Sequence, residues 1–152
     1  MRTRLIILLT TLLVTVGCGF KGHNERARRL LQQAQTEFEQ GNYTKSLASI
    51  EQLRAEFPEE IETRKEALKL YQEVSLKQAQ EELAYADSAL QVAQRDYEAI
   101  KAKVDADFAK MQATAEDFKK MQQLKNVRDS LQAKFDQQCA KIKYIHRKQK
   151  EV

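Results

Sequence analysis

The chain has 152 residues, of which 42% are hydrophobic and 32% are charged. The charged fraction is above the average of globular proteins, which is typical of a body with much surface and little core. Removing residues 1–17 takes away Arg2 and Arg4, and the remaining 24 basic residues then face 22 acidic ones, a net charge of +2. So small an excess does not indicate binding to nucleic acid, and we expect no nucleic-acid partner.

The helix-breaking residues are confined to the front of the chain. All four glycines and the one proline lie at or before Pro58, and the segment from Glu59 to Val152 contains neither. Glycine and proline are the strongest helix breakers, so nothing in that segment forces a helix to stop. We therefore predict an all-α fold.

The N-terminus combines basic and apolar residues. Arg2 and Arg4 precede a run of twelve mostly apolar residues, 5–16. This run is too short to span a bilayer, which needs about twenty residues. It fits the pattern of a secretory signal peptide that is removed on maturation. A buried core helix is the alternative, but nothing nearby could cover so uniform an apolar run.

The apolar run ends in Thr15-Val16-Gly17-Cys18. This ending resembles the lipobox of bacterial lipoproteins, in the relaxed form found in Bacteroidetes, with Thr15 where an aliphatic residue is usual. The resemblance implies that Cys18 is lipidated on its sulfur, that the signal is cleaved before it, and that the new amine is acylated. Two or three acyl chains would anchor the protein firmly, since each buried methylene contributes about 0.8 kcal/mol. A plain signal peptide with an incidental cysteine is the alternative.

The residue after the cysteine bears on location. The residue after the cysteine is Gly19 and not aspartate. In this the chain resembles lipoproteins that are sent on to the outer membrane. No acidic run follows Cys18, which favours a body that faces the periplasm. Residues 19–24 are expected to form a short polar tether, and His23 has no cluster of metal ligands near it in the sequence. We expect no metal or other cofactor.

Two amphipathic helices follow the tether. The first helix is expected to begin at Asn24 as its N-cap and to end at Gly41-Asn42. The second is expected to end at Pro58. The turn between them is so short that the two helices must lie antiparallel. The apolar face of the first is formed by Ala27, Leu30, Leu31, Ala34 and Phe38, and that of the second by Leu47, Ile50, Leu53 and Phe57.

This hairpin resembles a tetratricopeptide repeat. The residues that match are Ala34, Phe38, Gly41-Asn42-Tyr43, Ser46-Leu47, Ile50 and Pro58. Gln33 and Glu37 stand where the motif prefers apolar residues, and Leu53 is larger than the usual alanine. Residues 61–74 could begin a second repeat, but a concave binding surface normally needs at least three. The resemblance therefore implies a packing cap, with a peptide groove as the alternative.

The rest of the chain carries two heptad seams, in which apolar residues alternate in steps of three and four. Phe108 comes four residues after the first seam, and this change of step predicts a local unwinding of the supercoil. Val127 and Cys139 flank the polar positions of the second seam and could substitute for them. The first seam is Leu83, Ala86, Leu90, Ala93, Tyr97, Ile100 and Val104; the second is Met121, Leu124, Arg128, Leu131, Phe135, Gln138, Ile142 and Ile145.

A turn between the seams would let them cover each other. Thr114 with Asp117 three residues later indicates a helix start, and Asn126 with Asp129 is a second candidate. We favour a turn at 112–114, because it leaves two arms of similar length and a monomer, although a homodimer is possible. The expected pairs are Val104 with Met121, Ile100 with Leu124 or Val127, Leu90 with Phe135, and Leu83 with Ile142 or Ile145.

The predicted fold is thus all-α, a short tetratricopeptide-like helical hairpin followed by a long helix that folds back as an antiparallel coiled-coil hairpin. Its divisions are a signal peptide at 1–17, a lipidated tether at 18–24, the front hairpin with the start of the long helix at 25–75, and the coiled-coil hairpin at 76–152. The chain resembles a group of Bacteroidetes lipoproteins with a tetratricopeptide-like front, through Leu83-Ala84-Tyr85-Ala86-Asp87-Ser88 and the end from Cys139 to His146.

Few residues suggest chemistry. Cys139 is expected to be a small hydrophobe on the seam, although a lone thiol in the oxidising periplasm could pair between chains. No nucleophile–base pair is apparent, so we expect no enzyme. The last residues form a basic tail, which comprises Lys141, Lys143, Arg147, Lys148 and Lys150. The tail could contact a partner or anionic headgroups, or its charges could only interact favourably with the dipole of their own helix.

The sequence therefore predicts a non-enzymatic envelope lipoprotein of the outer membrane. Helical surfaces would make it an adaptor or assembly factor for an unidentified envelope protein. The alternative is a periplasmic chaperone or carrier that clasps client chains between helical arms. An adaptor needs only an exposed patch, whereas a carrier needs an apolar pocket or an open groove.

Overall fold

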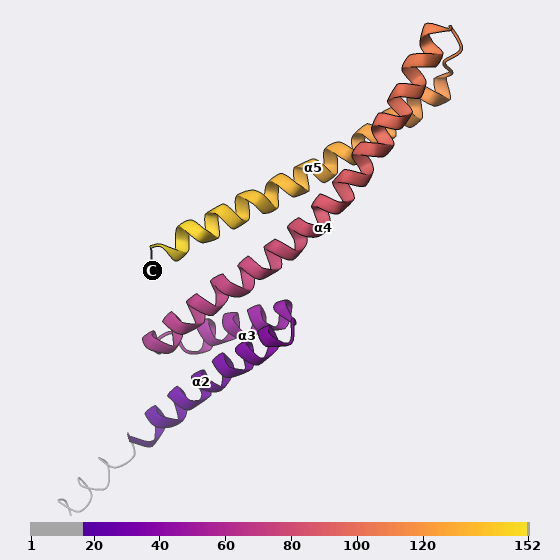
Figure 1. Cartoon of the computed structure of the whole chain (residues 1–152). Helices are drawn as coiled ribbons and strands as arrows, with labels where there is room; N and C mark the ends of the chain where they lie inside the picture. Colours follow the sequence, from indigo (N-terminus) through magenta and orange to yellow (C-terminus); the bar gives the residue numbers. More distant parts are fainter. Residues whose placement is uncertain (1–16, 152) are drawn as a thin grey trace, which may run out of the picture. The chain divides into compact units, whose positions relative to one another are not determined.

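The computed structural model describes residues 17–151 and places most of them in four α-helices (Figure 1). The predicted all-α fold is confirmed, and no strand occurs among the described residues. The expected signal peptide lies outside the described residues except for Gly17, and the side chain of Cys18 is not described. The helices are α2 (Gly17–Glu39), α3 (Tyr43–Glu56), α4 (Ile61–Ala109) and α5 (Ala115–Gln149).

The chain divides into two units within α4. The front unit extends to Val74 and holds α2, α3 and the first turns of α4; the hairpin unit comprises Ser75–Val152. The core of the front unit is built from fully or nearly fully buried side chains that all three helices contribute, namely Ala34, Ile50, Leu53, Ala67, Leu70 and Val74.

A buried polar contact joins α2 to α3. The hydroxyl of Ser46, which is fully buried, donates a 2.7 Å hydrogen bond to the carbonyl oxygen of Ala34. Both side chains are small, so the two helices can approach closely here. The hydroxyl is thereby satisfied, which a buried polar group requires.

The turn between α2 and α3 has the form that the sequence predicts. Gly41 has φ 77°, a left-handed conformation that glycine adopts without a steric penalty. The Gly41 amide donates to Phe38, and the Asn42 amide donates to Glu37, at 2.9 and 2.8 Å. This pair of bonds is the Schellman motif, which satisfies carbonyls at a helix end. Tyr43 is half-buried, with its ring 6.1 Å from that of Phe38.

Pro58 lies between α3 and α4, where the sequence predicts a stop. Phe57, only 2% exposed, ends α3, and its ring contacts that of His23 edge-on at a centroid distance of 4.6 Å. The carbonyl oxygen of Pro58 accepts a hydrogen bond from Arg64 at 2.6 Å. These contacts fix the connection between the two helices.

The expected polar tether and the N-cap at Asn24 are wrong. Helix α2 already begins at Gly17, so residues 18–24 are helical and Asn24 lies inside the helix. The amide of Asn24 instead donates to Glu60 across the front unit, at 2.8 Å. A capping residue marks a helix start only where the preceding residues leave the helix. Glycine inside a helix costs only about 1 kcal/mol relative to alanine, so Gly19 and Gly22 do not stop α2.

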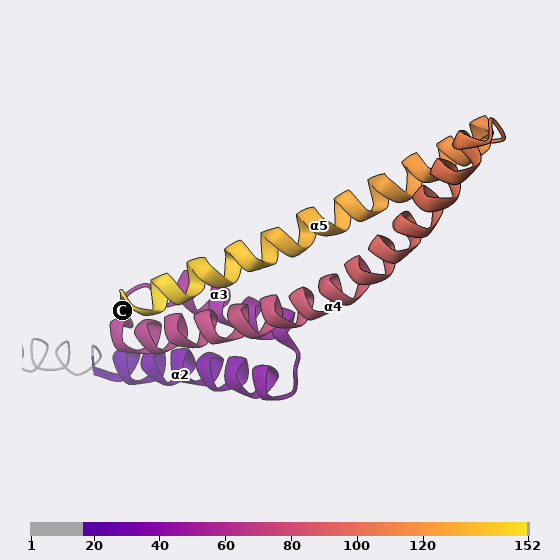
Figure 2. The same ribbon diagram turned by 45° about the horizontal axis from the view of Figure 1, so that its top comes forward.

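The hairpin unit consists of the rest of α4 and of α5, which returns antiparallel to it (Figure 2). The predicted fold-back is therefore confirmed, with the chain reversing at residues 110–114. On α4 the buried positions recur every seven residues at Ala79, Ala86, Ala93 and Ile100, followed by Val104. On α5 all eight positions of the predicted second seam are half-buried or buried.

Contacts between the arms fix their register. The guanidinium of Arg128 lies 4.3 Å from the centroid of the Tyr97 ring. Ile100 and Leu124 line one groove together, as expected from the sequence. One expectation is wrong, because Val127 is 50% exposed and does not replace Arg128 on the seam. Phe108, four residues beyond the first seam, is 67% exposed.

Candidate interaction surfaces

The closed end of the hairpin is held by two capping motifs. The amides of Met111 and Gln112 donate to Phe108 and Asp107, at 2.9 and 2.8 Å, in a second Schellman motif. Its left-handed residue is Met111, with φ 58°. A side chain in this conformation costs roughly 1–2 kcal/mol that glycine would not incur. The turn is thus well bonded but strained.

The predicted helix start at Thr114 is present. The Thr114 hydroxyl accepts from the Asp117 amide at 3.2 Å, and the Asp117 carboxylate accepts from the Thr114 amide at 3.1 Å, which forms a capping box. Lys103 of α4 donates to Asp117 at 2.6 Å. The hydrogen bond from Lys103, followed by those from Thr114, lowers the pKa of Asp117 from 3.8 to about 2. The cap therefore also ties α5 to α4.

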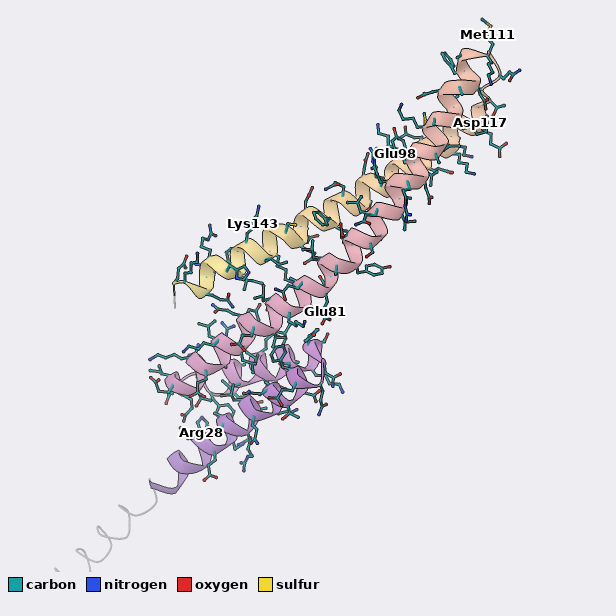
Figure 3. The ribbon with its side chains drawn as sticks, in the orientation of Figure 1. Arg28, Glu81, Glu98, Met111, Asp117 and Lys143 are labelled. Carbon is teal, nitrogen blue, oxygen red and sulfur yellow. The ribbon has the colours of Figure 1, made fainter. Side chains whose placement is uncertain are left out.

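Apolar side chains gather at this end. Met111 is 97% exposed, Phe108 67% and Phe118 41%, and the two phenylalanine rings meet edge-on at 6.2 Å between centroids. The side chain of Met111 points away from both helices at the end of the hairpin (Figure 3). In the heptad pattern Phe108 comes four residues after the first seam, and nothing in that pattern predicts this exposed group.

A groove runs along one side of the hairpin. It is about 480 Å³ in volume, and Tyr85, 77% exposed, stands at its edge. The side-chain oxygen of Gln138 is buried in the seam beneath it and has no hydrogen-bond partner. An acceptor left in that state is costly. The groove is lined by Glu81, Glu82, Tyr85, Ala86, Leu131, Lys134, Gln137 and Gln138.

This groove was not predicted from the sequence. Tyr85 is out of phase with the heptad seam, being two residues after Leu83 and one before Ala86. A large aromatic side chain on the outer face of a seam was the signal that could have identified it. The depth of the groove has no such signal, because it depends on the small Ala86 lying beside Leu131 and Gln138.

The basic tail forms the last turns of α5. Lys143 is exposed, on the side of α5 away from α4 (Figure 3). The guanidinium of Arg147 and the ammonium of Lys148 lie over the ring of Tyr144, at 5.3 and 5.9 Å from its centroid. Lys148 also bonds Glu151 at 2.6 Å, which raises the pKa of Lys148 and lowers that of Glu151. Lys141 is half-buried, and Lys150 is the C-cap.

The other predicted site residues are not brought together. Gly41 and Asn42 precede α3 and Tyr43 is its first residue, whereas Pro58 follows it, so they mark opposite ends of one helix. Cys139 is a free thiol, half-buried on α5 as the seam pattern predicts. No group of metal-binding side chains occurs among the described residues, and no helix within 17–151 is long and apolar enough to cross a membrane.

Comparison with known proteins adds no identification. No family model, no curated protein and no solved structure matches the chain. Function must therefore be argued from the surfaces themselves.

Proposed function

We propose that this chain is a non-enzymatic lipoprotein of the bacterial outer membrane, held by acyl chains on Cys18 and facing the periplasm. In this proposal the front unit is a tetratricopeptide-like cap. The hairpin unit presents a helical surface to an envelope protein, and the chain acts as an adaptor or assembly factor for that protein.

The observation that carries the adaptor function is the groove beside Tyr85. It joins an exposed aromatic ring to a floor of apolar and amide groups. A partner helix laid along it would bury Tyr85 and cover the apolar side chains of the floor. Tyrosine in such a place is typical of interaction hot spots, because it buries much area and loses little entropy.

The chaperone alternative has less support. A client clasped between the arms of the hairpin would need space there. The seam positions Ala86, Ala93 and Val104 are at most 6% exposed, so the arms already occupy each other's apolar faces. An adaptor uses the outer groove and leaves this seam closed.

The groove can be tested by photocrosslinking in cells. A benzoylphenylalanine in place of Tyr85 should form one discrete adduct, and the same group in place of Glu98, outside the groove, should not. A Leu131→Lys change in the Tyr85 background should remove the adduct, because it puts a charge on the groove floor. A ladder of many adducts would favour the chaperone, and equal yields at both positions would contradict a groove-specific partner.

The lipid anchor is tested separately. Cys18→Ser should move the protein from the membrane fraction to the soluble periplasm, and mass spectrometry of the unchanged chain should find acyl groups on Cys18. A wild-type protein that is soluble and carries no acyl group would overturn the anchor. The crosslinking result does not depend on this outcome.

A further inference from the structure

The exposed face of α5 near its end carries charge of one sign. Within residues 141–150 there are five Lys or Arg residues and no Asp or Glu. The nearest carboxylate, Glu151, is paired with Lys148. Arg147 also acts on the charge of Glu151. Lys141, Lys143 and Lys150 form none of the ion pairs found among the described residues. The charge is therefore concentrated and largely unneutralised.

The helix dipole does not account for all of this charge. Cations near a helix C-terminus are favourable, but the effect falls off within the last turn. His146, Arg147 and Lys148 lie in that turn. Lys141 and Lys143 lie further back, where the dipole has little effect. These two lysines therefore add charge to the cluster that the helix dipole does not account for.

The cluster surrounds an aromatic ring. Tyr144 is 52% exposed, and Arg147 and Lys148 extend over its face. Ile145, next to it in sequence, is only 7% exposed and faces the seam, so Tyr144 points outward by helical geometry. Tyrosine with flanking Lys and Arg is the combination found at the headgroup level of membranes, where the ring enters the interface and cations meet lipid phosphates.

We propose that this face, formed by Lys141, Lys143, Tyr144, Arg147, Lys148 and Lys150, binds the surface of an anionic phospholipid bilayer. The inference rests on the proposed function only in that a chain anchored through Cys18 is always beside a bilayer. A lipid surface matches this face better than a protein does, because it offers negative charge of one sign and requires no complementary shape. The lipid contact is distinct from the groove, which is lined by residues 81–86 and 131–138.

A single tryptophan can report this contact, because the chain has none of its own. Tyr144→Trp places the probe on the face, and Tyr85→Trp is the matched control, an exposed tyrosine whose neighbours are Glu81 and Glu82. The full-length chains are reconstituted into vesicles of phosphatidylcholine, with or without phosphatidylglycerol. Any N-terminal anchor is the same in all of them.

We expect the probe at position 144 to shift to the blue and to be quenched by brominated acyl chains in the anionic vesicles only, with the probe at 85 unchanged. Adding Lys143→Glu and Arg147→Glu should weaken the response by about fivefold or more for each cation removed, and salt should weaken it too. A second probe at an exposed position, Lys143→Trp, keeps the test valid if Tyr144→Trp fails to fold.

Three results would overturn the proposal. The probe at 144 could stay in water with anionic vesicles, or respond equally in neutral ones. It could also respond to added soluble envelope proteins and not to lipid, which would assign the face to a protein partner. Mass spectrometry of Cys18 is read independently, so a failed anchor and a failed lipid face are distinguishable.

Discussion

The front unit and the hairpin unit are both helical, but they bury different kinds of side chain. The core of the front unit contains large side chains, and those of Phe57, Ile50, Leu53 and Val74 are at most 2% exposed. Along the hairpin the buried positions of α4 are mostly alanine, and the facing positions of α5 are mostly half-buried. Six of the seven ion pairs found among the described residues lie in the hairpin unit.

This difference follows from the number of helices. Three helices enclose a core, whereas two can only share a seam, so the larger seam residues of α5 keep one side toward water. The front unit should therefore depend on a few large contacts, and the hairpin on many small ones. Surface ion pairs contribute little each, which leaves close packing as the main support of the hairpin.

The largest expected effect comes from cutting a large side chain. Leu53→Ala should lower the stability of the front unit by about 2–5 kcal/mol, because it leaves a cavity in an enclosed core. Leu131→Ala, on the half-buried seam, should cost roughly half as much. Hydrogen exchange of the full chain separates the two units. Equal losses at both sites would contradict the contrast between core and seam.

The converse change should damage the hairpin. Ala93→Leu puts a large side chain where 6% of the residue is exposed, and should cost about 1–3 kcal/mol by forcing the arms apart. Ala99→Leu, on the exposed face of the same helix, should change stability by about 0.5 kcal/mol or less. Urea denaturation measures both. A neutral Ala93→Leu would mean that the seam is loosely packed.

The two Schellman turns sharpen the comparison further, because one has glycine at its left-handed residue and the other has methionine. Gly41→Ala should destabilise the front unit by about 1 kcal/mol. A β-carbon there would meet no atom within 4 Å, so the cost is backbone strain alone. Met111→Gly should stabilise the hairpin by roughly 0.5 kcal/mol. This is the backbone strain that the change relieves, minus the larger conformational entropy that glycine loses on folding. Opposite signs in thermal unfolding are the expected result.

The smallest effect concerns acid. The pKa of Asp117 is lowered to about 2 in the folded chain, below its ordinary 3.8, so its contribution is present above pH 4. That contribution is lost as the pH falls through 3.8 toward 2. The protection of the Asp117 and Phe118 amides, measured as exchange relative to the intrinsic rate at each pH, should fall over this range, and Asp117→Asn should flatten the response. The Ser46 bond in the front unit is neutral and should show no such change, so a parallel loss there would argue against a local cause.

The sequence predicted those features that depend on periodicity or on local capping. Both seams, the Thr114–Asp117 box and the Gly41 turn follow from residue types at fixed spacing. The choice of Arg128 over Val127 could not be predicted, because it depends on Tyr97 lying opposite. Asn24 was misassigned because its partner, Glu60, is distant in sequence. The groove at Tyr85 and the exposed Met111 were missed, since each depends on how two helices meet.

The seven-residue repeat of the seams also restricts which insertions and deletions the hairpin can accept during evolution. Removing one heptad from each arm preserves every seam contact on either side and shortens the hairpin by about 10 Å, at 1.5 Å per residue. Removing one or two residues from a single arm turns the rest of that arm's alanines and leucines toward water. Related hairpins should therefore differ in length by paired heptads, with the turn at 110–114 displaced as a unit.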